Sequence, residues 1–184
     1  MVHEHRKPRS LLALAVFGLA TAGAAWYGSR YSKGNRDPWY RALDKPEFTP
    51  PDKAFPLIWA ALYALIAWSG WRVWCAAPSR DRRAALELWI SQLAANAKWS
   101  RLFFGEHRIV ASLGDSLALE GTILSYINAA RKVDSAAAAA FVPYAAWVGF
   151  ATVLNAEIAR RNLLPAELLD AARSLYRSAS FAIR

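Results

Sequence analysis

Aromatic side chains recur at helical spacing within apolar stretches of this sequence. Phe55, Trp59 and Tyr63 stand four residues apart, so they share one face of a helix. The spacing returns at Trp99 with Phe103, one turn after Asn96, and at Trp147 with Ala151. Core packing or a lipid-facing belt would account for any one of these rings. Together they could stack on a flat, apolar macrocycle, for which the small Ala151 would leave room.

One acidic residue is a further candidate for the site. Asp115 lies inside an apolar stretch, where an ionisable group suggests function by default. A structural ion pair is the alternative. If the chain reverses near Glu106, Lys98 and Asp115 lie at one depth, and we favour a pair that neutralises both charges. By the same reasoning Glu120 lies level with Gln92.

Composition excludes several other chemistries. The single cysteine, Cys75, rules out an internal disulfide framework and a multi-cysteine zinc site, and three scattered histidines do not suggest a metal cluster. We find no hydrolytic triad and no phosphate-binding loop, so we predict no catalytic residue and no metal ligand. The net charge of +9 could attract nucleic acid or anionic lipid. Nine tryptophans placed in apolar runs favour lipid over nucleic acid.

Five stretches are candidates for membrane-spanning helices: residues 10–29, 54–71, 84–104, 109–130 and 135–156. The third and fourth carry charged residues, and a soluble amphipathic helix is the alternative for each of them. Short connections nevertheless favour an antiparallel bundle. We therefore predict an all-α fold, a five-helix transmembrane bundle with a long first loop over residues 30–53.

The two ends of the chain differ from this central domain over residues 10–162. Residues 1–9 form a basic N-terminal segment, which together with the first apolar run also resembles a secretory signal. Residues 163–184 are predicted to form an amphipathic C-terminal helix from near Pro165, either on anionic lipid or docked on protein. The distribution of Lys and Arg favours a cytoplasmic C-terminus.

Four segments of the sequence together carry a family resemblance. They contain, in order, Trp39-Tyr40 through Trp59 and Tyr63; Gln92, Asn96, Trp99 and Phe103-Phe104-Gly105; Ala111 and Asp115; and Pro143-Tyr144, Trp147, Phe150-Ala151-Thr152 and Leu154-Asn155. In this the chain resembles the TspO family, which comprises the bacterial tryptophan-rich sensory protein and the mitochondrial translocator protein, or peripheral benzodiazepine receptor. The resemblance covers residues 15–162.

The resemblance implies a five-helix bundle whose first loop folds over a pocket for porphyrins such as protoporphyrin IX and haem. Trp59 and Trp147 match pocket positions of the family. The loop from Tyr40 to Phe55 would close over the ligand, with Lys45 meeting the propionates. The candidate ligand-binding residues are Tyr40, Phe48, Phe55, Trp59, Tyr63, Asn96, Trp99, Phe103, Asp115, Trp147 and Ala151. The stretch Asn155–Glu157 lacks the tyrosine of the animal sterol motif, which puts cholesterol binding in doubt.

The leading hypothesis is therefore a non-enzymatic, multi-pass membrane protein that binds a tetrapyrrole as a sensor or transporter-like regulator. Porphyrin or haem is the expected ligand, with no obligatory cofactor. One alternative is a structural subunit of a pigment–protein complex, and another is an enzyme that degrades porphyrin photo-oxidatively. Expected partners are membrane lipid and either a second copy of the chain or a larger complex, in a bacterial cell membrane rather than the mitochondrial outer membrane.

Overall fold

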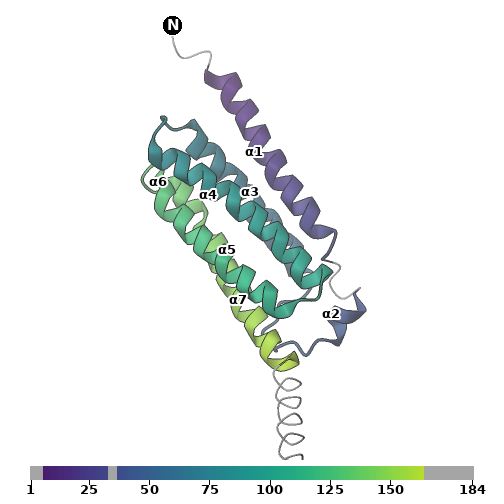
Figure 1. Cartoon of the computed structure of the whole chain (residues 1–184). Helices are drawn as coiled ribbons and strands as arrows, with labels where there is room; N and C mark the ends of the chain where they lie inside the picture. The colour runs from purple at the N-terminus through teal and green to yellow at the C-terminus, as the bar shows by residue number, and fades with distance from the viewer. Residues whose placement is uncertain (1–5, 33–36, 164–184) are drawn as a thin grey trace, which may run out of the picture.

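The computed structural model describes residues 6–32 and 37–163, and all regular secondary structure in these ranges is helical (Figure 1). The all-α class is thereby confirmed. The amphipathic C-terminal helix that we predict lies outside the described residues, apart from its first residue.

Five long helices lie side by side and account for most of the described chain. They are α1 (Arg6–Ser29), α3 (Ala54–Cys75), α4 (Arg80–Ser100), α5 (Ile109–Ala130) and α7 (Val142–Asn162). The shorter elements are α2 (Pro38–Ala42), α6 (Ser135–Ala140) and a π-helical turn, η2 (Arg101–Gly105). The bounds of α5 agree with the predicted segment. Helix α1 begins four residues earlier than predicted, so part of the basic segment is helical.

Within residues 6–32 and 37–163, three helical segments are long and apolar enough to cross a membrane: Ser10–Ser29, Ala54–Cys75 and Ser135–Asn162. The last of these comprises α6 and α7, which are separated at Phe141. Pro143 stands in the first turn of α7, where it has no N–H with which the hydrogen-bond ladder of α6 could continue. Helix α4 carries charged residues at both ends, and α5 carries Asp115 and Glu120 within its length.

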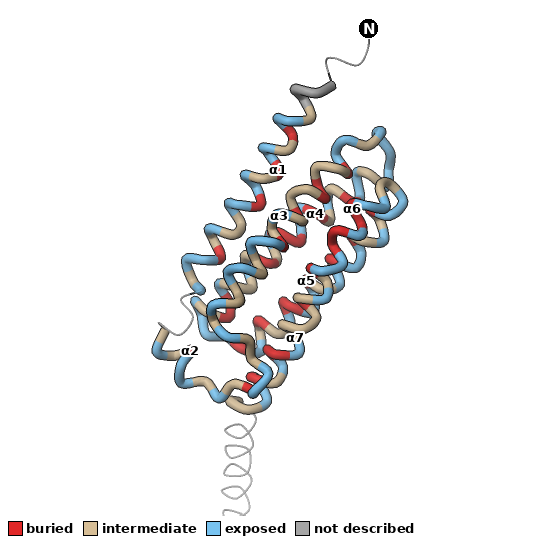
Figure 2. Tube along the Cα trace, turned by 180° about the vertical axis from the view of Figure 1, so that it is seen from behind, coloured by how far each residue is buried: buried red, intermediate tan, exposed pale blue. Residues whose placement is uncertain are grey.

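The helices bury their inward faces and expose their outward ones, as Figure 2 shows. Helix α4 packs on α5, α3 on α1, and α7 on α5. The core between α1, α3 and α4 is tight at Gly70, against which Phe17 and Trp89 pack. Those two rings meet edge to face with centroids 4.6 Å apart. The Trp89 indole also donates a hydrogen bond of 2.9 Å to the carbonyl of Ile66.

A polar connection ties α3 to the start of α6. The Ser69 hydroxyl donates to the carbonyl of Ala137 at 2.7 Å, and the Tyr126 hydroxyl lies 2.7 Å from Ser69 Oγ. Because Ser69 has one proton to give, Tyr126 must be the donor of the second bond. Both hydroxyls are fully buried and satisfied, so this contact fixes how α3, α5 and α6 meet.

Asp134 joins the start of α6 to the end of α3. Its carboxylate accepts from the Ala137 amide as an N-cap and pairs with Arg72 at 2.7 Å. Burial acts to raise the pKa of the Asp134 carboxyl, but hydrogen bonds from Arg72 and Ala137 outweigh it and hold that pKa below its usual value. The stabilisation is therefore present above the carboxyl's unfolded pKa of about 4 and is lost as the pH falls through the lower folded value.

We expect Asp134→Ala to destabilise the protein by about 1–2 kcal/mol, since it removes both the cap and the ion pair. Asp134→Asn retains a capping oxygen and should cost about half as much. Thermal unfolding in detergent, followed by circular dichroism at pH 7 and pH 3, measures both. The difference between wild type and Asp134→Asn should shrink at pH 3, and an equal difference at both pH values would contradict the assignment.

Candidate functional site

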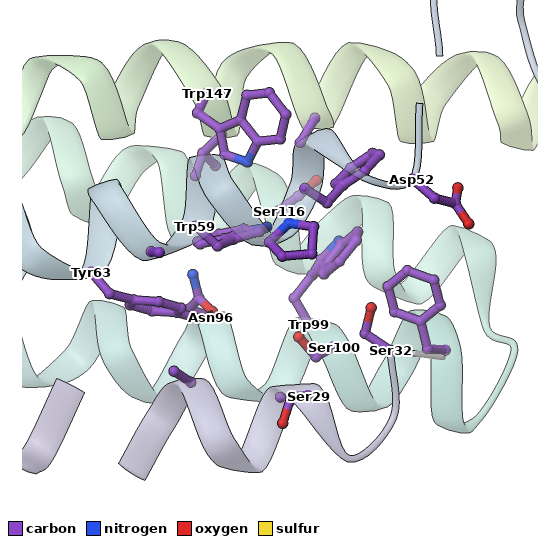
Figure 3. Close-up of a pocket in the computed structure, with 18 of the residues that line it drawn as sticks. Ser29, Ser32, Asp52, Trp59, Tyr63, Asn96, Trp99, Ser100, Ser116 and Trp147 are labelled. Carbon is purple, nitrogen blue, oxygen red and sulfur yellow. Dashed lines mark hydrogen bonds between the residues drawn. The ribbon is translucent and has the colours of Figure 1, made fainter. Parts of the chain in front are cut away.

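A cavity of about 690 Å³ lies between the end of α1, the start of α3, the end of α4 and the middle of α7. Figure 3 shows Trp59 and Tyr63 reaching it from α3, Trp99 from α4 and Trp147 from α7. Eight of the eleven candidate residues line it: Tyr40, Phe55, Trp59, Tyr63, Asn96, Trp99, Trp147 and Ala151. The volume falls within the range of pockets that hold drug-sized molecules.

The aromatic side chains of α3 form one wall. Trp59 stacks on Tyr63 with ring centroids 5.2 Å apart and an interplanar angle of 29°. Phe55 meets Trp147 of α7 edge to face at 5.7 Å. The four-residue spacing on α3 thus places three rings along one face, which an apolar planar ligand could contact.

Asn96 holds two tyrosines in place beside this wall. Its side-chain oxygen accepts from the Tyr63 hydroxyl at 3.2 Å, and its amide nitrogen donates to the Tyr144 hydroxyl at 2.9 Å. Asn96 and Tyr144 are buried, and Tyr144 in turn packs edge to face on Trp59. Asn96 therefore orients aromatic side chains of α3 and α7 and lines the cavity itself.

The π-helical turn η2 changes which phenylalanine reaches the cavity. The Glu106 amide donates to the carbonyl of Arg101 at 2.8 Å, a bond over five residues in place of four. The wider turn brings Phe104 into the lining, and Phe103 stacks behind Trp99 with centroids 5.2 Å apart. The prediction for Phe103 assumed regular α-helical spacing and so identified the neighbouring residue.

Two other predicted residues also lie outside the cavity lining. Phe48 lies in the irregular loop before α3, where it is 49% exposed and packs against Phe150 of α7. Asp115 pairs with Lys98 at 2.7 Å, and its side chain is 5% exposed where that of Lys98 is 64% exposed. The ion pair expected from the depth of the two residues is confirmed.

The polar groups at the mouth differ from those expected. Lys45 donates to the carbonyls of Tyr40 and Leu43 and lies 4.7 Å from the Tyr40 ring centre, so it braces the loop and does not line the cavity. Lys53 and Asp52 line it instead. Burial, and secondly the charge of Asp52, raises the pKa of the Tyr40 phenol, which stays neutral and able to donate a hydrogen bond.

The loop over the cavity is anchored to the last turn of α7. The Asp44 amide donates to the side-chain oxygen of Asn162 at 2.9 Å, and the Asn162 amide returns a bond of 3.0 Å to the Asp44 carbonyl. Arg161 adds an ion pair to Asp44 at 3.5 Å. At the other end of the loop, Trp39 stacks on His107 with centroids 4.1 Å apart.

The contribution of α1 to the cavity was missed by sequence reasoning. Ala25, Gly28 and Ser29 line it from the last turns of this helix. A β-carbon on Gly28 would lie 3.0 Å from Ser100 Oγ, so α1 and α4 approach closely here. Small residues at three- and four-residue spacing were the available signal. Among the described residues, no group of three His, Cys, Asp or Glu side chains could hold a metal ion.

Comparison of the sequence with known proteins identifies relatives of this chain. The sequence model of the TspO/MBR family matches residues 14–161. Protein CrtK of Rhodobacter capsulatus is 34% identical over 154 residues, covering 83% of this chain and 94% of that protein. The translocator protein of Homo sapiens is 32% identical over 148 residues (79% and 88%). The tryptophan-rich sensory protein of Cereibacter sphaeroides is 36% identical over 126 residues (68% and 78%).

Proposed function

Because the chain belongs to the TspO/MBR family, we propose that it binds a tetrapyrrole, porphyrin or haem, in the cavity under its first loop, as a membrane sensor or transporter-like regulator. The observation that carries the proposal is the convergence of Trp59, Tyr63, Trp99 and Trp147 on one cavity of about 690 Å³. Flat aromatic ligands require such stacking faces and only a few polar anchors.

The mechanism follows from the residues around the cavity. The macrocycle stacks on Trp59 and Trp147, and Lys53 at the mouth meets a propionate in the place that we first assigned to Lys45. The loop closes over the ligand while its Asp44 stays tied to Asn162. Occupancy then shifts the loop toward its closed state and alters the surface that a partner contacts.

In this proposal all five long helices cross the membrane, and the C-terminus is cytoplasmic. The pairing of Lys98 with Asp115 supports embedding of α4 and α5, because it neutralises two charges within those helices. Relatives from bacteria support a bacterial cell membrane as the location. A homodimer or membership in a larger complex remains part of the proposal.

Quenching of tryptophan fluorescence tests the proposal. We expect protoporphyrin IX at micromolar concentration to quench the purified protein in detergent, and Trp59→Leu/Trp147→Leu to weaken binding by at least tenfold. Trp26→Leu/Trp74→Leu is the matched control, because it also removes two indoles but from exposed positions outside the cavity. Unchanged affinity in the cavity variant would refute the assignment.

The same sample distinguishes binding from photo-oxidative degradation. In an enzyme, Trp59 and Trp147 would act as redox-active side chains, and illumination would remove the porphyrin absorption band. Either Trp→Phe change would then abolish that loss. A band that persists under light in wild type, with binding intact, supports a receptor.

Exposed charges at the junction of α4 and η2 favour a second candidate, a structural subunit of a membrane complex. The side chains of Lys98 in α4 and Arg101 in η2 are 64% and 57% exposed, in a segment that we place in the membrane. Although Lys98 pairs with Asp115 and Arg101 with Glu106, exposed charged groups there are costly toward lipid, and contact with another protein would cover them better. Gentle solubilisation followed by mass spectrometry tests this candidate. Co-purification of the protein with one large complex in fixed stoichiometry supports a structural subunit, and a homodimer on its own argues against it.

A further inference from the structure

A second concave site lies at the opposite end of α4 from the aromatic cavity. A groove of about 560 Å³ is lined there by residues from Pro78 to Ile90, among them Arg80, Arg82 and Arg83. The aromatic cavity contacts α4 only from Asn96 onward. The groove therefore shares no residue with the cavity, and its role is independent of the function proposed above.

The three arginines of the groove differ in whether their side chains are already bonded within the protein. Arg82 donates twice to the carbonyl of Trp74, at 2.7 and 3.1 Å, and lies 4.8 Å from the Trp74 ring centre. Among the described residues, Arg80 and Arg83 have neither an ion pair nor a side-chain hydrogen bond. Two guanidinium groups are thus available to an anion, beside a third that is fixed in place.

The face of α4 that bears these groups changes from cationic to apolar along its length. Arg80, Arg83, Leu86 and Ile90 follow one another at three- and four-residue spacing, and all line the groove. Ile90 is 63% exposed and lies about 10 Å beyond Arg83 along the helix axis. The order matches a molecule with an anionic head and an apolar chain. Glu87, the one acidic lining residue, lies between Leu86 and Ile90 in the sequence.

The position of the groove identifies the source of such a molecule. Tryptophans 68, 71 and 74 cluster in the last two turns of α3, as is typical of a membrane–water interface. The Trp71 indole donates to the carbonyl of Ser10 at 2.8 Å, so the start of α1 lies at this end too. Lys132, in the loop after α5, lies at this end as well, with its Nζ 3.6 Å from Oδ1 of Asp81. This end of the bundle is basic at the depth of lipid headgroups.

We propose that this groove binds one anionic phospholipid of the surrounding bilayer. Arg80 and Arg83 contact the phosphodiester, and an acyl chain lies along Leu86 and Ile90. An excess of two positive charges in the lining (three arginines against Glu87) favours the anion. The exposed isoleucine favours a lipid over a nucleic acid or an acidic peptide, neither of which would cover it with hydrocarbon.

Native mass spectrometry of the full chain in neutral detergent tests this proposal. We expect phosphatidylglycerol to bind about tenfold more tightly than phosphatidylcholine with the same acyl chains. Arg80→Gln/Arg83→Gln should abolish this preference. Arg108→Gln/Arg160→Gln removes the same charge at the opposite end of the bundle, from residues outside both the groove and the cavity lining, and should retain the preference. Circular dichroism and porphyrin quenching should not change in either variant, which separates this test from that of the cavity.

Three results would overturn the proposal. The first is equal binding of the two lipids by wild type, and the second is a preference that survives in Arg80→Gln/Arg83→Gln. The third is glycerol 3-phosphate, which has the headgroup chemistry without acyl chains, binding as tightly as phosphatidylglycerol. That last result would make the groove a site for free phosphate esters.

Discussion

Gly70→Ala is expected to be among the most damaging single substitutions in the bundle. A β-carbon at Gly70 would lie 2.5 Å from Trp89 Nε1 and 2.6 Å from Phe17 Cδ1, far inside van der Waals contact. Neither ring can give way easily, because Trp89 is hydrogen-bonded to Ile66 and packs edge to face on Phe17. We expect a loss of about 3 kcal/mol, at the upper end of the range for overpacked cores, and a fall in the melting temperature of several degrees.

Gly121→Ala is the matched control for this change. Both glycines lie within long helices, but a β-carbon at Gly121 would meet nothing within 4 Å. Alanine should leave the melting temperature unchanged or slightly raised, since it favours a helix over glycine. Thermal unfolding in one detergent compares the two variants with wild type. Equal effects of the two substitutions would contradict the close contact of α1, α3 and α4 at Gly70.

In the ion pair between α4 and α5, replacement of the lysine should destabilise the protein more than replacement of the aspartate. The Asp115 side chain is 5% exposed, whereas Lys98 is 64% exposed and can extend toward water when it loses its partner. Lys98→Met should therefore cost about 3 kcal/mol, because it leaves a buried carboxylate without a counter-charge. Asp115→Asn should cost about 1 kcal/mol, since the freed ammonium can be solvated.

The double variant Lys98→Met/Asp115→Asn completes the cycle. It removes both charges, so it should be more stable than Lys98→Met alone by about 2 kcal/mol. Chemical or thermal unfolding of the four proteins in one detergent gives the coupling energy. Additive effects of the two substitutions would show that the pair contributes nothing beyond its separate side chains.

Sequence reasoning predicted those features that depend on the local residue pattern and on the depth of a residue along two antiparallel helices. The ends of α5 were placed at Ile109 and Ala130 because an apolar run there is bounded by short polar turns. The pairing of Lys98 with Asp115 followed from the reversal of the chain near Glu106. Helical spacing also placed Phe55, Trp59 and Tyr63 on one face, and all three line the cavity.

The remaining features depend on contacts between distant segments, which spacing alone does not encode. The part of α1 that lines the cavity is made of small residues, and these could have faced lipid or another helix equally well. The places of Phe48 and Lys45 depend on the path of an irregular loop that Asn162 fixes from far along the chain. The exchange of Phe103 for Phe104 results from one backbone hydrogen bond over five residues.

The backbone hydrogen bond from Glu106 to Arg101 shifts which residues correspond to each other when homologues are compared by sequence position. A π-helical turn accommodates one residue more than an α-helical turn spanning the same rise. In a homologue with an ordinary turn, the counterpart of Phe104 would stand one position earlier after Trp99. An alignment without a gap at Arg101–Gly105 would then pair the wrong aromatic residues, and a mutation copied from that homologue would probe the packing behind Trp99 in place of the cavity lining.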